Sequence, residues 1–304
     1  MDFALNEDQR AIQDMAAQFT ADQITPHAEK WDEEKIWPTE TAKAAGELGF
    51  GSIYVSEDAG GCGLNRVDSV LVFEQLSKGC PSTAAMISIH NMATWMIDKF
   101  GNQGLKDKLL PSLVTLEHMA SYCLTEPGAG SDAASLKTKA VKDGDHYILN
   151  GAKAFISGGG TSDVYVVMAR TSDDGAKGIS AFAVEKDAPG LSFGAQEKKM
   201  GWRSQPTCAV MFDDCRIPAE NLIGEEGQGF KIAMQGLDGG RLNIAACSLG
   251  GASRALSEAV TYTKDRKQFG KSIADFQATQ FKLADMATDL EACRLMLYSA
   301  ASQF

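Results

Sequence analysis

The first third of the chain carries its apolar residues at helical spacing. Asn6 is suited to cap a helix, and Ile12, Met15 and Phe19 follow at intervals of three and four residues, which puts them on one helix face. Pro38 begins another helix that ends at the segment ELGFG. The stretches VDSVLVFEQLSKGC and AAMISIHNMATWMIDKF are apolar nearly all round, as is typical of buried helices.

Near residue 120 the pattern changes to short runs that are rich in β-branched and aromatic residues. The runs are HYILNGAKAFIS, DVYVVMAR, GISAFAVEK and CAVMFDDCRIP. The turn signals Asp143-Gly144, Asn150-Gly151 and Asp174-Gly175 are expected to separate strands. The pattern predicts an antiparallel β unit over roughly residues 120–220.

The last part of the chain is helical again. Leu283, Met286, Leu290, Cys293 and Leu297 alternate spacings of three and four, which predicts a bundle seam. Two long helices cannot cover each other's apolar faces well. We therefore expect this helical unit to continue beyond Phe304 or to pack on another chain.

Helices, then a β unit, then helices predict an α+β multidomain fold. The domains expected are an N-terminal all-α domain (1–118), a middle antiparallel β domain (119–223) and a partly present C-terminal helical bundle (224–304). No G-x-G-x-x-G opens a helix after a strand, which argues against a Rossmann fold.

Charge and composition narrow the function classes. The 304 residues carry a formal net charge of −11, which argues against nucleic acid or an anionic membrane surface as a partner. No apolar run approaches the length of a membrane span. The seven cysteines and four histidines show no metal-ligand spacing, so no metal site is expected.

The N-terminal segment has neither a signal peptide's apolar core nor an arginine-rich transit pattern. This indicates bacterial cytoplasm, with a processed mitochondrial matrix protein as the alternative.

The segment YCLTEPGAGSDAAS combines hydroxyls, glycines and a Glu-Pro corner in front of a predicted strand. Taken alone, such a loop is also explained as a turn of the β unit with satisfied hydroxyls. It is followed in order by AFISGGG, GLDGGR and DRKQFGKSIADFQ. These four motifs together resemble the acyl-CoA dehydrogenase family of flavoenzymes, and the resemblance extends over the whole chain.

The resemblance implies FAD as cofactor and α,β-dehydrogenation of an acyl-CoA substrate. Electrons would pass to an electron-transfer flavoprotein, and the complete protein would be a homotetramer. The segments SIHNMATWMIDKFGN and KKMGWRSQPT are most similar to the short branched-chain branch, which acts on isobutyryl-CoA in valine breakdown.

The resemblance also implies which residues contact FAD. Thr125 would lie near flavin N1 and O2, Phe155 would cover a face of the ring, and Ser157 would donate to the N5–O4 edge. Arg266 would reach the pyrophosphate of a neighbouring subunit's FAD. The expected cofactor residues are Tyr122, Cys123, Leu124, Thr125, Gly130, Ser131, Phe155, Ile156, Ser157, Arg266, Gln268, Phe269, Phe276 and Gln277. Core packing remains an alternative for Phe155. For the segment KDRKQ the alternative is a solvated helix end, and for Phe269 and Phe276 it is packing.

The motif DGGR matches the family's acyl-CoA segment. It makes Ser131, Asp238, Gly239, Gly240 and Arg241 the expected substrate-binding residues. An aspartate and an arginine three residues apart share a helix face, so a surface ion pair is the alternative.

No catalytic base is found among these residues. The family uses a glutamate, either near the C-terminus or just before the arginine that Arg241 matches, where this chain has Gly240. Glu291 matches neither position. The resemblance therefore places the expected glutamate beyond Phe304 and predicts that the 304 residues alone are poorly active and bind FAD weakly. A non-catalytic acyl-CoA- or flavin-binding protein on the same scaffold and an acyl-CoA oxidase are the alternatives.

Overall fold

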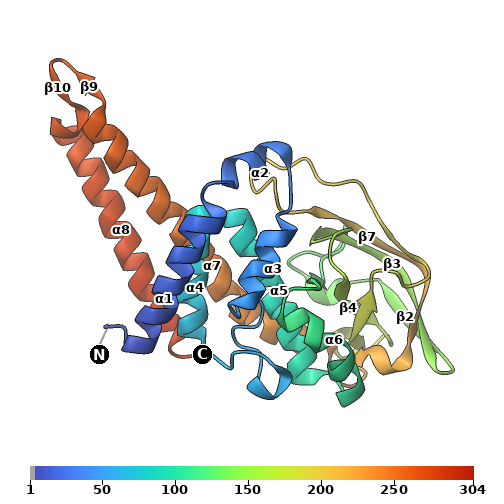
Figure 1. The fold of residues 1–304 in the computed structure, drawn as a ribbon. Coiled ribbons are helices and arrows are strands. Elements are labelled where there is room, and N and C mark those ends of the chain that lie inside the picture. The colour runs from blue at the N-terminus through green and yellow to red at the C-terminus, as the bar shows by residue number, and fades with distance from the viewer. Residues whose placement is uncertain (1–3) are drawn as a thin grey trace. The chain divides into compact units, whose positions relative to one another are not determined.

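The computed structural model describes residues 4–304, so residues 1–3 of the predicted first domain lie outside the described part. Along the chain a group of helices comes first, the strands of a sheet follow, and two long helices come last (Figure 1). The α-helices are α1 (Glu7–Phe19), α2 (Ala28–Glu34), α3 (Thr39–Glu47), α4 (Arg66–Gly79), α5 (Pro81–Phe100), α6 (Gln103–Val114), α7 (Gly229–Asp265) and α8 (Gln277–Ala301). A π-helical turn follows α1 at Thr20–Ile24.

The chain forms two compact units, each assembled from separate stretches of sequence. One unit contains Met1–Ala28, Arg66–Ala85 and Leu242–Phe304, and the other contains Glu29–Asn65 and Met86–Arg241. The division into three domains at residues 118 and 223 therefore stays a prediction about sequence segments.

The first unit is helical, and small residues bring its helices close together. A Cβ on Gly250 of α7 would lie 2.1 Å from the carbonyl oxygen of Glu74 on α4. A Cβ on Gly79 of α4 would lie 2.7 Å from the methyl group of Thr20. Close backbone approach of this kind requires glycine, so these two positions set the spacing of α4 from its neighbours.

The second unit is organised around an eight-stranded sheet. Most neighbouring strands are antiparallel, and the order along the sheet is β6-β7-β3-β2-β4-β5-β8, with β1 pairing parallel to β4. The strands are β1 (Ala120–Cys123), β2 (Lys139–Asp143), β3 (His146–Ser157), β4 (Val164–Arg170), β5 (Ile179–Glu185), β6 (Leu191–Phe193), β7 (Thr207–Pro218) and β8 (Leu222–Ile223).

Strand β4 is apolar at nearly every position because both of its faces are covered. Val164 and Val166 pack into a core that includes residues of helices α5 and α6. Tyr165 and Val167 point to the opposite face, where they pack with other strand residues, Phe182 of β5 among them. A strand that is buried on both faces loses the alternation of apolar and polar residues. The same arrangement keeps β1, beside β4, close to the centre of the sheet.

The predicted order of helices, β unit and helices is confirmed, with two differences of detail. The pairing of β1 with β4 is parallel, so the sheet is mixed. The prediction of a turn at Asn150-Gly151 is wrong, because both residues lie inside β3, at a register shift against β7. Gly151 has φ of 148°, and a Cβ there would lie 2.5 Å from Thr138 Oγ1. The glycine serves a β-bulge rather than a hairpin.

Candidate functional site

The segment that opens the candidate site leaves the sheet at the end of β1. Glu126 and Ala129 exchange backbone hydrogen bonds of 3.0 and 3.1 Å, so Pro127 and Gly128 form a tight turn. Beyond the turn, Gly130 and Ser131 are exposed. A Cβ at Gly130 would meet nothing within 4 Å, which leaves open space along this part of the loop.

Phe155 on β3 is held in an unusual backbone conformation. Its φ of 58° lies in the left-handed region, which bulky residues adopt only when their surroundings impose it. It falls at a second register shift of β3 against β7, between Lys153 and Ile156. The bulge turns the ring outward, so that Phe155 is 66% exposed. Core packing, the alternative for this residue, is therefore excluded within the chain.

Hydrogen bonds join β1 and the loop after it to the end of β3. The Ala154 amide donates to the Thr125 carbonyl at 2.9 Å, and the Ser121 hydroxyl donates to the Ser157 carbonyl at 2.5 Å. Thr125, Phe155 and Ser157, which lie about thirty residues apart in the sequence, are thus brought together by direct contacts on both sides.

A buried ion pair that sequence reasoning missed supports the same junction. The ammonium of Lys153, whose side chain is 0% exposed, lies 2.8 Å from Glu126 Oε1. Glu126 also accepts from the amides of Lys137 at 2.7 Å and Thr138 at 3.0 Å. Burial by itself raises the pKa of Glu126, but the hydrogen bond and charge of Lys153, with those amides, hold that pKa below its usual range. Glu126 is consequently an ionised acceptor and a poor candidate for a base.

Several expected cofactor residues offer only their backbone to a ligand. Cys123, Leu124 and Ile156 are buried to 0%, 6% and 3% exposure, with side chains in the two cores that flank the sheet. The hydroxyl of Tyr122 is buried and has no hydrogen-bond partner among residues 4–304. Burial raises the pKa of this phenol, so it remains a neutral donor.

The expected substrate segment lies on α7. Arg241 donates to Asp238 at 2.9 Å, and both side chains are mostly exposed, as a surface ion pair would be. Gly240 faces α5, where a Cβ would lie 2.9 Å from Met92 Sδ. Gly240 therefore has a packing role, and a side chain at this position would displace the methionine.

The residues expected to reach a neighbouring subunit's FAD gather at the hairpin between α7 and α8. It is formed by β9 (Lys267–Gln268) and β10 (Lys271–Ser272) (Figure 1). Phe269 at its turn is 94% exposed and packs edge-to-face on Phe276 at 6.3 Å between ring centroids. The structure places this group in the first unit and the Thr125–Ser157 group in the second.

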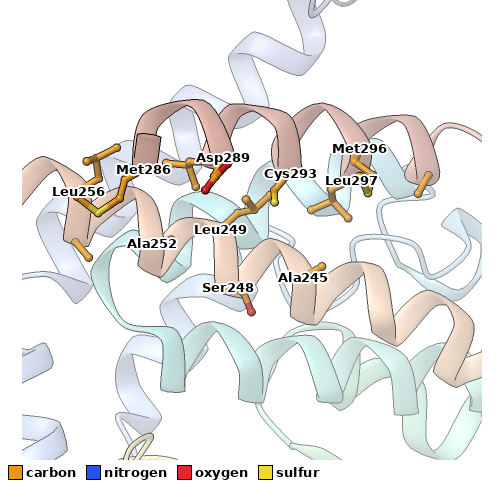
Figure 2. A pocket seen from close by; sticks show the side chains of 13 residues that line it. Ala245, Ser248, Leu249, Ala252, Leu256, Met286, Asp289, Cys293, Met296 and Leu297 are labelled. Carbon is orange, nitrogen blue, oxygen red and sulfur yellow. The ribbon is translucent and has the colours of Figure 1, made fainter. Parts of the chain in front are cut away.

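A cavity of about 840 Å³ lies elsewhere in the first unit, along the facing sides of α7 and α8 (Figure 2). The predicted seam residues Met286, Leu290, Cys293 and Leu297 line it. Its lining is almost entirely apolar and contains none of the expected site residues. The two helices thus leave the apolar face that the spacing predicts. Whether a continuation of the chain or another chain covers this face stays a prediction.

Comparison with known proteins gives one family for every part of the chain. The family models described as the N-terminal, middle and C-terminal domains of acyl-CoA dehydrogenase match residues 6–117, 121–215 and 227–304. The chain belongs to the acyl-CoA dehydrogenase family. Its members are oxidoreductases, and the chain is accordingly an enzyme that acts on acyl-CoA.

Individual relatives of this acyl-CoA dehydrogenase share its sequence and its fold. The mitochondrial isobutyryl-CoA dehydrogenase of Dictyostelium discoideum is 58% identical over 98% of this chain, which spans 72% of that protein. The structure of butyryl-CoA dehydrogenase from Megasphaera elsdenii is 40% identical, with a TM-score of 0.96 over 100% of this chain and 81% of that one. The FAD complex of PigA is 37% identical, with a TM-score of 0.95 over 100% and 80% of the two chains.

FAD is the cofactor of this acyl-CoA dehydrogenase, and the residues present fit it. The outward ring of Phe155 offers an apolar surface to a flavin. The second part of the site is β1 with the loop that follows it. There the Tyr122 hydroxyl has no hydrogen-bond partner among residues 4–304, and the space beside Gly130 is open. Among the described residues, no helix is long and apolar enough to cross a membrane.

Proposed function

We propose that this enzyme dehydrogenates a short branched acyl-CoA, isobutyryl-CoA, to the 2-enoyl-CoA and passes the electrons to an electron-transfer flavoprotein. The observation that carries the proposal is the junction of Thr125 with Phe155 and Ser157 through the Ala154–Thr125 and Ser121–Ser157 hydrogen bonds. The 58% identity to an isobutyryl-CoA dehydrogenase supports the choice of acyl chain.

In this proposal the second unit holds one FAD between two segments. The hydroxyls of Thr125 and Ser157 donate to the flavin edge, and Phe155 covers a ring face. Cys123, Leu124 and Ile156 act through the backbone, because their side chains are buried. FAD, when bound, supplies the acceptor for the hydride that leaves the β-carbon of the substrate. Tyr122, Gly130 and Ser131 complete the first of the two segments.

The acyl-CoA segment on α7 is proposed to bind the substrate through Asp238 and Arg241. Both side chains are mostly exposed and their ion pair is weakly held, since exposed pairs contribute little free energy. The pair can therefore open toward a ligand at small cost. Gly240 keeps the helix backbone close to α5. Gly239 belongs to the same proposed segment, and Ser131 supplies a hydroxyl from the loop.

The hairpin residues are proposed to contact the FAD of a neighbouring subunit in a homotetramer. A phenylalanine that is 94% exposed, Phe269, is an unusual surface residue for a free chain. Phe276 holds its ring in place, and Arg266, Gln268 and Gln277 surround it in sequence. Bacterial cytoplasm, or the mitochondrial matrix for a processed protein, is the compartment we propose.

We further propose that neither Glu126 nor Glu291 is the catalytic base. Glu126 is ionised and bound by Lys153 and two amides. Glu291 on α8 is mostly exposed and paired with Arg294. A carboxylate that takes an α-proton near neutral pH needs a desolvated site that raises its pKa. The pKa of Glu126 is instead lowered by Lys153 and the two amides, although burial by itself raises it, and Glu291 lies in contact with water rather than in a desolvated site.

Formation of 2-enoyl-CoA by the polypeptide 1–304 tests the proposal that neither Glu126 nor Glu291 is the catalytic base. With FAD, isobutyryl-CoA and an electron-transfer flavoprotein supplied, we expect turnover to be low or absent. Robust turnover would contradict this proposal, because it would require a working catalytic base within residues 1–304. Flavin binding without any thioester response would favour a non-catalytic flavin-binding protein. Rapid reoxidation of the reduced protein by oxygen would favour an oxidase.

A further inference from the structure

Lys153 occupies an uncommon place for a lysine, fully buried on β3 two residues before Phe155. Its ammonium donates to Glu126 Oε1 at 2.8 Å and to the carbonyl of Leu124 at 3.1 Å. These two acceptors belong to the residues on either side of Thr125. One buried side chain on β3 therefore donates hydrogen bonds to the residues immediately before and after the proposed flavin-binding threonine.

The energetics of burial make this contact a rigid one. A buried ammonium is strongly destabilising unless it is paired and hydrogen-bonded, so the fold favours the arrangement in which both acceptors stay in place. The carboxylate of Glu126 is fixed from its other side by the amides of Lys137 and Thr138. Displacement of the loop would break several of these bonds together.

We propose that Lys153 is a positioning residue for the flavin site. Through Leu124 and Glu126 it holds Thr125 in register with Phe155 and Ser157, without touching the cofactor itself. This inference rests on the proposed FAD site, because it concerns the geometry that the site requires.

The Ala154 amide reports on this role without being altered by the substitutions. It donates to the Thr125 carbonyl at 2.9 Å, and neither residue is changed when Lys153 or Glu126 is replaced. The Val164 amide, which donates to the Met119 carbonyl at 3.0 Å, serves as a reference elsewhere in the same unit. Hydrogen exchange of both amides is measured without added FAD, and FAD affinity is then measured by titration of flavin fluorescence.

Three variants separate positioning from charge burial. Lys153→Met removes the hydrogen bonds to Leu124 and Glu126, but it leaves the buried carboxylate of Glu126 without its cation. The double variant Lys153→Met with Glu126→Gln removes both charges, so it stays testable should the single variant fail to fold. Lys139→Met is the matched control, because Lys139 is exposed on β2, paired in register with Asn150 of β3.

Exchange of the Ala154 amide is expected to rise about tenfold or more in both Lys153 variants, because a hydrogen bond from a charged donor is lost. The dissociation constant for FAD should rise by a similar factor, with altered absorption of the bound flavin, while Val164 exchange and the Lys139→Met protein match the wild type.

The proposal is overturned if the folded double variant keeps wild-type exchange at Ala154 and wild-type FAD affinity. A wild-type protein that binds no FAD would instead contradict the proposed function. In that case the exchange of Ala154 still decides whether Lys153 holds the loop.

Discussion

Arg294 on α8 donates from Nε to Oε1 of Glu74 on α4 at 2.9 Å, across 220 residues of sequence. The Glu74 side chain is 2% exposed, and the hydroxyl of Tyr298 donates to its other oxygen at 2.9 Å. The last helix is therefore attached to the N-terminal part of the first unit through one buried carboxylate.

Replacing Arg294 with methionine should lower the free energy of unfolding by on the order of 3–5 kcal/mol, because a buried carboxylate loses its cation. Arg254→Met is the control, since the Arg254–Glu258 pair on α7 is exposed and should contribute less than about 1 kcal/mol. Urea unfolding followed by circular dichroism compares the two. Equal losses would contradict a special role for Glu74.

Gly158, directly after Ser157, combines positive φ with close packing. Its φ is 80°, and a Cβ would lie 2.3 Å from the hydroxyls of Ser121 and Ser162. Gly144 has φ of 60° but nothing within 4 Å. Gly144→Ala should destabilise by about 1–2 kcal/mol through backbone strain alone, and Gly158→Ala by about 1–3 kcal/mol more through overpacking. Thermal unfolding measures both losses of stability. Similar losses in the two variants would show that the side chains around Gly158 can move to accept a methyl group, and would contradict the overpacking argument.

Phe155 should matter for the cofactor much more than for stability. Because its ring is 66% exposed, Phe155→Ala is expected to change the free energy of unfolding by no more than about 0.5 kcal/mol. The FAD dissociation constant should rise roughly tenfold with the loss of an aromatic contact. Val141→Ala, at a side chain that is 61% exposed, should change neither quantity. An unaltered affinity in Phe155→Ala would remove the ring from the flavin site.

His90 makes the stability of the second unit sensitive to acid. Its Nε2 lies 2.8 Å from the Leu113 carbonyl, and its Nδ1 accepts from the Ala120 amide at 2.9 Å, which requires the neutral ring. Burial lowers the pKa of His90 to about 4, although hydrogen bonds to backbone groups of Leu113 and Gly51 oppose the shift.

The unfolded state therefore binds more protons than the folded state between about pH 6.5 and pH 4. Stability is fully present above this window and falls through it by on the order of 3 kcal/mol as the pH decreases. Urea unfolding across the window should give a shallower pH dependence for His90→Gln than for wild type. His118→Gln, at an exposed position, is the control and should follow the wild-type curve. A His90→Gln curve parallel to wild type would contradict the assignment.

Local signals in the sequence were sufficient where neighbouring residues decide the structure. Asn6 caps α1 as predicted, and Gln9 completes a capping box. The continuous apolar run of β4 was predicted as a strand, although only the packing of both faces explains why it lacks alternation.

Contacts distant in sequence were beyond such signals. Asn150-Gly151 has the composition of a hairpin turn, but pairing with β7 makes it a bulge. The burial of Lys153 depends on Glu126, which lies 27 residues earlier, and no periodicity in the segment GAKAFIS marks this lysine as buried. The flavin motifs were recognisable by resemblance, whereas the groups that hold them together required the register of the sheet.

An anaerobic titration of the FAD-loaded polypeptide 1–304 with isobutyryl-CoA, followed by the visible absorption of the flavin, tests the proposed site most directly. We predict that the thioester shifts the absorption bands while the flavin stays oxidised, because we propose that the site binds the substrate and that neither Glu126 nor Glu291 is its base. An unchanged spectrum at saturating thioester would contradict the proposed substrate site. Bleaching would mean that the flavin is reduced, and it would show that residues 1–304 contain a working catalytic base.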